Sequence, residues 1–287
     1  MKFNVKKFSI ILVCIIVVSF AASGLILYFT GGVSALSVGQ HQLIYSREFE
    51  MEGVKSIIVK TVNARVSIIP VTVAEHKIRA DFYGNVSTNL GNLQPELSAE
   101  LINGVLNIEI TYPKTINIGL INIERLYLDV YVPSDYAESM KVQTVSSCVN
   151  IRKFNLDVLA MSSVSGCLTA ENVETESFTA RTTSGKVELK EVSGQLDIAT
   201  ISGEVSVILS RLDKNLKVGT VSGKTSVIIP EDAFFDFELR TVSGSMTNQF
   251  GAVLDCADRK NIKGSVGEGA SKIFIETTSG SIELLKK

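Results

Sequence analysis

The chain has 287 residues, of which 45% are hydrophobic and 20% are charged, and its formal net charge is −2. This composition excludes a disordered polymer, and the charge balance argues against a nucleic-acid binder, which would show a basic patch or stripe. There is no Trp, and the only histidines are His41 and His76. Because most acid–base catalysis uses His or clustered carboxylates, we expect no enzyme and no catalytic, cofactor-binding or metal-binding residues.

The first predicted element is a transmembrane helix over Phe8–Phe29, a run of 22 residues without a charge. At about 1.5 Å per residue such a helix is about 33 Å long, which matches the ~30 Å hydrocarbon core of a bilayer. Lysines precede the run, so the positive-inside rule leaves residues 1–7 in the cytoplasm and exports the rest. We therefore expect the lipid bilayer as a partner and a single-pass protein of the cell membrane with an extracytoplasmic C-terminal domain.

A cleaved signal peptide is the alternative interpretation, because Val33-Ser34-Ala35 resembles a small-residue cleavage site. The apolar run exceeds the ~7–15 residues of a signal-peptide core, which favours an uncleaved anchor. Cys14 lies inside the run, which disfavours a lipoprotein anchor. Residues 30–45 are predicted to be a linker, and residues 46–287 the exported domain.

Before residue 140 the predicted strands are irregularly spaced. They cover Lys55–Val73, Lys77–Phe82, Leu101–Thr111 and Leu126–Val132, with connections over Gly84–Ser98 and Tyr112–Glu124. This part is predicted to cap the repeats that follow, as an open stack of repeats requires.

One motif then recurs, Thr-x-Ser-Gly followed by alternating polar and apolar residues. Its copies begin at Thr144, Ser163, Thr182, Thr200, Thr220, Thr241 and Thr277, with a decayed copy at Thr61. From Ser147 onward the fourth positions are 19, 19, 18, 20, 21 and 36 residues apart. We expect Gly to allow a turn through positive φ, and Ser to bond to the local backbone. The predicted turn glycines are Gly166, Gly185, Gly194, Gly203, Gly223, Gly244 and Gly280, of which Gly194 marks a half-period copy.

Alternation of period two after each Gly predicts strands with one buried face. A unit of about 19 residues cannot bury that face alone, so successive units must stack. The predicted fold is all-β, a single-stack β-solenoid (β-helix) with ~19-residue coils, preceded by one N-terminal transmembrane helix. An antiparallel sandwich is the alternative fold. The predicted core residues are Val187, Leu189, Leu196, Ile198, Val205, Val207, Leu216, Val218, Val227 and Phe237.

The spacing of 36 contains an insertion, roughly Asn248–Ala270, which is expected to be a lateral loop. Ser271–Leu285 is predicted to be the terminal coil of the stack. Lys286 and Lys287 would then discourage end-to-end association at its open edge.

Cys148 and Cys167 each follow the last position of a motif copy and lie 19 residues apart. On adjacent coils about 4.8 Å apart, their Cα atoms would fall within the range of a disulfide. Export would permit oxidation. The sequence leaves two outcomes open, an inter-coil disulfide or two unpaired thiols.

Three patterns mimic functional sites but have better structural explanations. The segment Gly219–Thr225 resembles a phosphate loop, but it has three residues between its glycines where that motif needs four. The Ser residues of the repeats lack a nearby base in the sequence and are expected to form a ladder bonded to the backbone. Lys186 and Glu204 are about one coil apart and are expected to form an exposed ion pair.

The Thr-Val-Ser-Gly motifs at 220–223 and 241–244, with strand pairs between them, resemble the bacterial β-strand-repeat family labelled "putative adhesin". The resemblance covers roughly residues 50–285 and departs from the pattern at Ser147 and at Asn63-Ala64. It implies attachment at a cell surface and brings no catalytic residues. Membrane-anchored members are often found in Gram-positive bacteria, some encoded beside envelope-stress sensing systems.

The sequence therefore predicts a membrane-anchored extracytoplasmic β-solenoid that acts as an adhesion, binding or scaffold surface in the bacterial cell envelope. Its expected partners are the bilayer, through Phe8–Phe29, and a cell-wall glycan or another envelope protein, without nucleic acid. An accessory or sensor protein of an envelope-stress response is the alternative. A carbohydrate-active enzyme on a β-helix is the second alternative.

Overall fold

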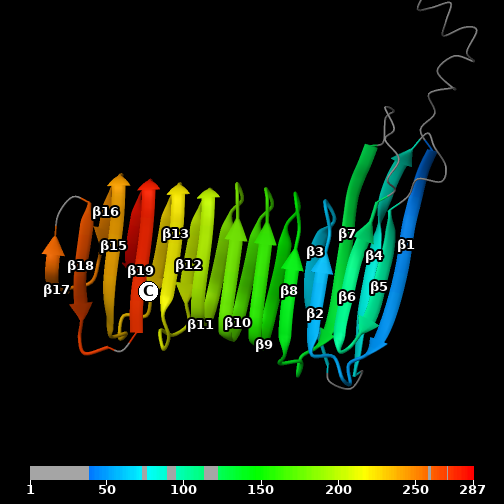
Figure 1. Ribbon diagram of the computed structural model, residues 1–287, viewed down its shortest axis with the longest axis horizontal. Helices are drawn as coiled ribbons and strands as arrows, with labels where there is room; N and C mark the ends of the chain where they lie inside the picture. Colours follow the sequence, from blue (N-terminus) through cyan, green and yellow to red (C-terminus); the bar gives the residue numbers. More distant parts are fainter. Residues whose placement is uncertain (1–38, 73–75, 89–94, 113–121, 258–259, 270) are drawn as a thin grey trace, which may run out of the picture.

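The computed structural model describes residues 39–72, 76–88, 95–112, 122–257, 260–269 and 271–287. These residues form twenty β-strands that stand side by side along the long axis of the molecule (Figure 1). The predicted all-β class is confirmed. The predicted transmembrane helix over Phe8–Phe29 lies outside the described residues, and within them no helix has the length and apolar character needed to cross a membrane.

The strands form two facing sheets, and three long strands take part in both. The first sheet contains, in spatial order, β1 (Gly39–Glu50), β4 (Lys77–Thr88), β7 (Asn122–Pro133), β3 (Arg65–Val71), the first halves of β9 (Val149–Ser163), β10 (Leu168–Thr182) and β11 (Val187–Ser202), then β12 (Val205–Leu209), β14 (Thr225–Ile229), β20 (Ile282–Lys286) and β16 (Met246–Asn248).

The second sheet lies against the first. It contains β5 (Glu96–Ile102), β6 (Val105–Thr111), β2 (Ser56–Lys60), β8 (Ser139–Gln143), the second halves of β9, β10 and β11, then β13 (Leu216–Ser222), β19 (Ser271–Ser279), β15 (Phe235–Ser243), β18 (Asn261–Val266) and β17 (Val253–Ala257).

The core lies between the two sheets and follows the predicted alternation. In β12, Val205, Val207 and Leu209 are buried while the residues between them are partly exposed. All ten predicted core residues are buried, which confirms that prediction. Leu168 pairs in parallel with both Val149 and Val187, so equivalent positions of successive repeats lie on one another. This parallel stacking confirms a solenoid-like fold and excludes the antiparallel sandwich.

The motif glycines form the corners where the chain passes from the second sheet to the first. A Cβ atom added to Gly185 would lie 1.8 Å from the carbonyl oxygen of Gly166 on the preceding coil. One added to Gly203 would lie 2.0 Å from that of Gly185. Of the seven predicted turn glycines, only Gly194 and Gly223 have positive φ. The prediction that these glycines serve mainly positive φ was wrong, because most are required by the close approach of neighbouring coils.

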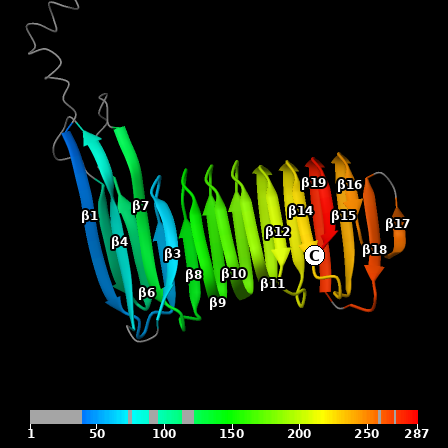
Figure 2. The ribbon, with the colours of Figure 1, turned by 180° about the vertical axis from the view of Figure 1, so that it is seen from behind.

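Stacking order follows sequence order only in the middle of the molecule. Strands β2 and β3 lie between the pair β6–β7 and the pair β8–β9. Near the other end, β19 and β20 lie between β13–β14 and β15–β16 (Figures 1 and 2). The prediction that Ser271–Leu285 forms the terminal coil was therefore wrong, since this coil fills a position that the chain had passed over.

Antiparallel pairs end both sheets near β1 and the second sheet at the other end, where the first sheet ends with β16 in parallel pairing with β20. The insertion expected to be a lateral loop contains β17 and β18, and β18 pairs antiparallel with β15. At the opposite end β1 pairs with β4 over its whole length, from Gly39 opposite Thr88 to Glu50 opposite Lys77. Residues 39–45 thus belong to a strand and not to the predicted linker. The two predicted connections also shorten, because β4 continues to Thr88 and β7 begins at Asn122.

Candidate functional site

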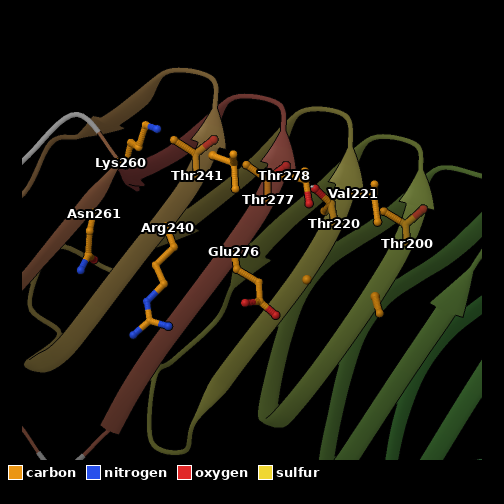
Figure 3. Close-up of a pocket in the computed structure, with 13 residues that line it drawn as sticks. Thr200, Thr220, Val221, Arg240, Thr241, Lys260, Asn261, Glu276, Thr277 and Thr278 are labelled. Atoms are coloured by element: carbon orange, nitrogen blue, oxygen red, sulfur yellow. Dashed lines mark hydrogen bonds between the residues drawn. The ribbon is translucent and has the colours of Figure 1, made fainter.

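The corners of the Thr-x-Ser-Gly motif begin with a buried hydroxyl. The Oγ1 atom of Thr182 accepts a hydrogen bond from the N–H of Gly185 at 3.1 Å, and Ser163 Oγ accepts one from Gly166 at 2.7 Å. This local bond closes the turn. The first-position side chains of the other coils are buried as well, and Figure 3 shows a row of threonines beneath the corner loops, namely Thr241, Thr277, Thr220 and Thr200.

The third position of the motif is exposed and contributes chiefly its backbone. The N–H of Ser184 donates to the carbonyl of Val164 at 2.8 Å, and the N–H of Ser202 donates to that of Thr183 at 2.7 Å. Hydroxyl bonds to the backbone occur at Ser146 and Ser165. The expected ladder of Ser hydroxyls is therefore limited to the early corners, where the first-position hydroxyls of Thr61, Ser163 and Thr182 accept the bond that closes the turn.

The second position of the motif points outward and forms a line along the corner of the stack. Six of its eight members are aliphatic, and their exposed fractions run from 43% at Val145 to 62% at Val242. Consecutive members are linked through the backbone, as where the N–H of Val164 donates to the carbonyl of Val145 at 3.2 Å. We call this line the aliphatic ridge, which comprises, in spatial order, Val62, Val145, Val164, Thr183, Ile201, Val221, Thr278 and Val242.

A hollow of about 610 Å³ lies beside the ridge on the outer face of the second sheet (Figure 3). Its floor is a cross-strand row in which Gly219 pairs with Glu276, and Glu276 pairs with Arg240. Gly219 has no side chain, which leaves the hollow open above its backbone. The side chain of Arg240 forms an ion pair with Glu238 and lies over the ring of Phe274. The ridge thus has a polar flank that carries both signs of charge.

The ridge is the strongest candidate for an interaction surface, because contiguous exposed apolar residues mark sites of association. Sequence reasoning missed it, although the signal was present. Period-two alternation that buries Thr220 must turn Val221 outward, and the same holds for every Thr-Val-Ser-Gly copy.

A family model described as Toastrack DUF4097 matches residues 54–189 and, in a second match, residues 157–285. The chain belongs to the Toastrack DUF4097 family. This confirms the family resemblance carried by the Thr-Val-Ser-Gly motifs. The two matches overlap within β9, β10 and β11, the long strands that take part in both sheets.

Several solved structures are similar to this Toastrack chain. One is a "putative cell adhesion protein" from Clostridium sporogenes, with 15% identity and a TM-score of 0.40, covering 86% of this chain and 100% of that one. Another is a "putative adhesin" from Bacteroides fragilis, with 12% identity, a TM-score of 0.45 and coverage of 85% and 97%. A "putative lipid binding protein" from Parabacteroides distasonis has 12% identity, a TM-score of 0.35 and coverage of 85% and 94%. No curated protein matches the chain.

Two cysteines of this Toastrack chain lie beside the ridge. Cys148 and Cys167 directly follow the fourth motif position on adjacent coils, their Cα atoms are 4.4 Å apart, and a disulfide joins them. The preceding residue Ser147 stands where later coils have Gly. Its hydroxyl donates to the carbonyl of Ala64 at 2.6 Å, which accommodates a side chain at this corner.

The remaining sequence candidates have structural roles in the Toastrack fold. The segment resembling a phosphate loop is the corner between β13 and β14, where Lys224 pairs with Glu283 at 2.7 Å. Lys186 and Glu204 form the expected cross-coil ion pair at 3.8 Å. A hydrogen bond from Lys190 lowers the pKa of nearby Glu188. Within the described part of the chain, no three His, Cys, Asp or Glu side chains gather where they could hold a metal ion.

Proposed function

We propose that this chain is a membrane-anchored, extracytoplasmic binding protein that docks another envelope protein along its aliphatic ridge. The ridge carries the proposal. It presents one β-branched residue per coil on a continuously hydrogen-bonded stack, so the spacing of its contacts is fixed. The proposal assigns no catalytic, cofactor or metal residue.

The chemistry of the ridge favours a protein partner over a glycan. Its members are Val, Ile and Thr, without an aromatic ring on which a sugar could stack. Side chains branched at Cβ are already restricted in χ1, and ordering few rotamers on binding favours affinity. The flank with Arg240 and Glu276 supplies the polar rim that protein interfaces have around an apolar centre.

One observation supports the extracytoplasmic location, and a second supports a position close to the membrane. The disulfide between Cys148 and Cys167 is typical of exported proteins, because the cytoplasm keeps thiols reduced. The strand β1 begins at Gly39, so only residues 30–38 separate the stack from the apolar run Phe8–Phe29. A segment that short would hold the β1 end of the stack near the bilayer.

The test uses the full chain in lipid nanodiscs and measures its binding to intact cells and to protease-treated cells. A ridge variant carries Val145→Thr, Val164→Thr, Ile201→Thr and Val221→Thr. Thr already occurs in the ridge at Thr183 and Thr278, so the variant should fold. We expect part of the binding to be saturable and sensitive to protease treatment of the cells, and we expect this part to fall at least tenfold in the ridge variant.

The matched control changes exposed valines away from the ridge, Val158→Thr and Val253→Thr, which should bind like the unaltered chain. Unchanged binding by the ridge variant would overturn the role of the ridge. Equal binding to protease-treated cells would overturn the protein partner.

A sensor that signals through its anchor is the second candidate, favoured by the shortness of the 30–38 connection. Replacing Phe8–Phe29 by an unrelated transmembrane segment separates the two functions. A docking protein should keep its function after this exchange, whereas a sensor should lose it.

A further inference from the structure

The outer face of the first sheet near β1 brings together residues that are far apart in the sequence. Three strands, β1, β4 and β7, pair antiparallel there, and their outward side chains form rows across the strands. The rows are Ile44–Tyr83–Tyr127, Ser46–Asp81–Asp129 and Glu48–Arg79–Tyr131. No member of these rows belongs to the aliphatic ridge.

A hollow of about 630 Å³ lies over β1 and β4 on this face. We call it the β1–β4 groove, and its outward-facing lining is Ile44, Ser46, Glu48, Arg79, Asp81 and Tyr83. Aromatic, carboxylate and guanidinium groups therefore converge on one surface.

The ring of Tyr83 is held in place from the β7 side. It stacks on Tyr127 with 5.2 Å between the ring centroids, and its hydroxyl donates to Asp129 at 2.8 Å. Burial and this bond raise the pKa of Tyr83 to about 12. The opposite ring face turns toward β1, where Ile44 is 72% exposed and leaves the groove open.

The polar groups of the groove are also fixed before any ligand binds. Ser46 donates to Asp81 at 2.7 Å, and the guanidinium of Arg79 lies 3.2 Å from the same carboxylate. Arg79 also sits 4.3 Å from the centroid of the Tyr131 ring. A ligand hydroxyl would thus meet positioned donors and acceptors beside an aromatic face.

We propose that the β1–β4 groove binds pyranose units of a neutral glycan. The apolar face of a sugar ring packs on an aromatic side chain, and its hydroxyls bond to carboxylates and guanidinium groups, as in sites with an apolar wall and few fixed polar groups. Each charged group that faces this groove is balanced, Arg79 by Asp81 and Glu48 by Lys77 at 3.7 Å, so the groove offers no excess positive charge to an anionic polymer. The inference rests on the proposed binding function in the envelope but uses a different surface.

Isothermal titration calorimetry can report binding for the unaltered chain and for variants that lack the Tyr83 side chain. The full chain in lipid nanodiscs, free of sugar-based detergent, is titrated with a hexamer of N-acetylglucosamine, with maltohexaose and with polygalacturonate. We expect saturable binding of at least one neutral hexamer and none of the polyanion. Tyr83→Ala should weaken binding at least tenfold. Tyr83→Phe keeps the ring and should stay within about threefold of the unaltered chain.

Asp81→Asn keeps the size of the side chain and should weaken binding about fivefold or more, with an unfolding midpoint measured alongside to confirm that the variant folds. The ridge variant should bind glycan normally. Failure of the unaltered chain to bind either neutral hexamer, or equal affinity in Tyr83→Ala, would overturn the proposal. Either result would leave the ridge proposal standing, because that proposal is tested by protease-sensitive binding to cells.

Discussion

The order in which coils stack differs between the middle of the molecule and its two ends. Between β9 and β14, each coil lies on the coil that precedes it in the sequence. At each end, one coil is enclosed between two others, β2–β3 at one end and β19–β20 at the other. The Thr-x-Ser-Gly motif therefore fixes the conformation of a coil but not its place in the stack. The segments between the motif copies determine the stacking order.

The difference follows from the edges that a parallel stack leaves open. An exposed parallel edge has unpaired N–H and C=O groups that invite association. Here antiparallel pairs end three of the four sheet edges, namely β1 with β4, β5 with β6 and β17 with β18, and the short strand β16 ends the fourth with a parallel pair. Near β17 the chain passes over one coil position, which β19 and β20 fill later, whereas near β1 the enclosed coil of β2 and β3 comes first and β4 to β7 then extend the sheets beyond it.

The largest effect is expected where coils approach most closely. In Gly185→Ala the new Cβ would meet the carbonyl of Gly166 at 1.8 Å, so neighbouring coils must separate, at a cost of at least about 3 kcal/mol in the free energy of unfolding. Gly251→Ala, where a Cβ meets nothing within 4 Å, should cost under about 0.5 kcal/mol. Urea unfolding measures both, and similar losses would contradict the role given to the corner glycines.

Ile275→Ala tests the enclosed position of β19. Ile275 is fully buried and pairs with Val218 on one side and Leu239 on the other. We expect a loss of about 2–5 kcal/mol, as for aliphatic residues in the centre of a core. Ile201→Ala, on the exposed ridge, should cost less than about 0.5 kcal/mol in the same unfolding experiment. A small loss of unfolding free energy in Ile275→Ala would contradict the enclosed position of β19 and indicate that its coil lies at an open end of the stack.

The paired variant Cys148→Ser, Cys167→Ser should lose about 3 kcal/mol of stability, since a disulfide closing a loop of this length contributes roughly that amount. Thiol labelling without reductant gives a direct check. Label should enter these positions only after reduction, and the Ser variant supplies the background. Reaction of both residues before reduction would show that the thiols are unpaired.

The smallest effect concerns the titration of Tyr83. Asp129→Asn removes the accepting carboxylate, so the pKa of Tyr83 should fall from about 12 toward its usual 10.0. Because the folded pKa is the higher one, neutral Tyr83 adds stability below pH 10.0, and this contribution is lost as pH rises through about 12. Tyrosinate absorbance, compared with that of Tyr83→Phe, measures the shift. An unchanged pKa would remove Asp129 as a cause.

Local structure could be predicted from the sequence because it depends on neighbouring residues. Alternation identified Val205 and Val207 as core, and the repeated Ser-Gly identified the corners. Stacking order could not be predicted, since the copy at Thr277 has the same pattern as the copy at Thr220. What distinguishes them is the pairing of β15 with β18, because β18 lies in the insertion and carries no repeat signal.

The two candidate surfaces also differ in how far the sequence predicts them. The ridge could have been predicted from the sequence, because one of its residues occurs in each motif copy. The β1–β4 groove could not have been predicted, because antiparallel pairing across long connections brings Ile44, Asp81 and Tyr127 together. The sequence contains those residues without any spacing that relates them.

The enclosed position of β19 and β20 has a consequence for how the protein is made. Until residues 271–286 are available, β13–β14 and β15–β16 have no shared neighbour, and both present open edges to whatever is nearby. A chain that emerges with its N-terminus first cannot close the gap early, however much of it has already folded. Closure of the stack therefore waits for these residues, and a chain interrupted before residue 271 would expose strand edges to cellular proteases.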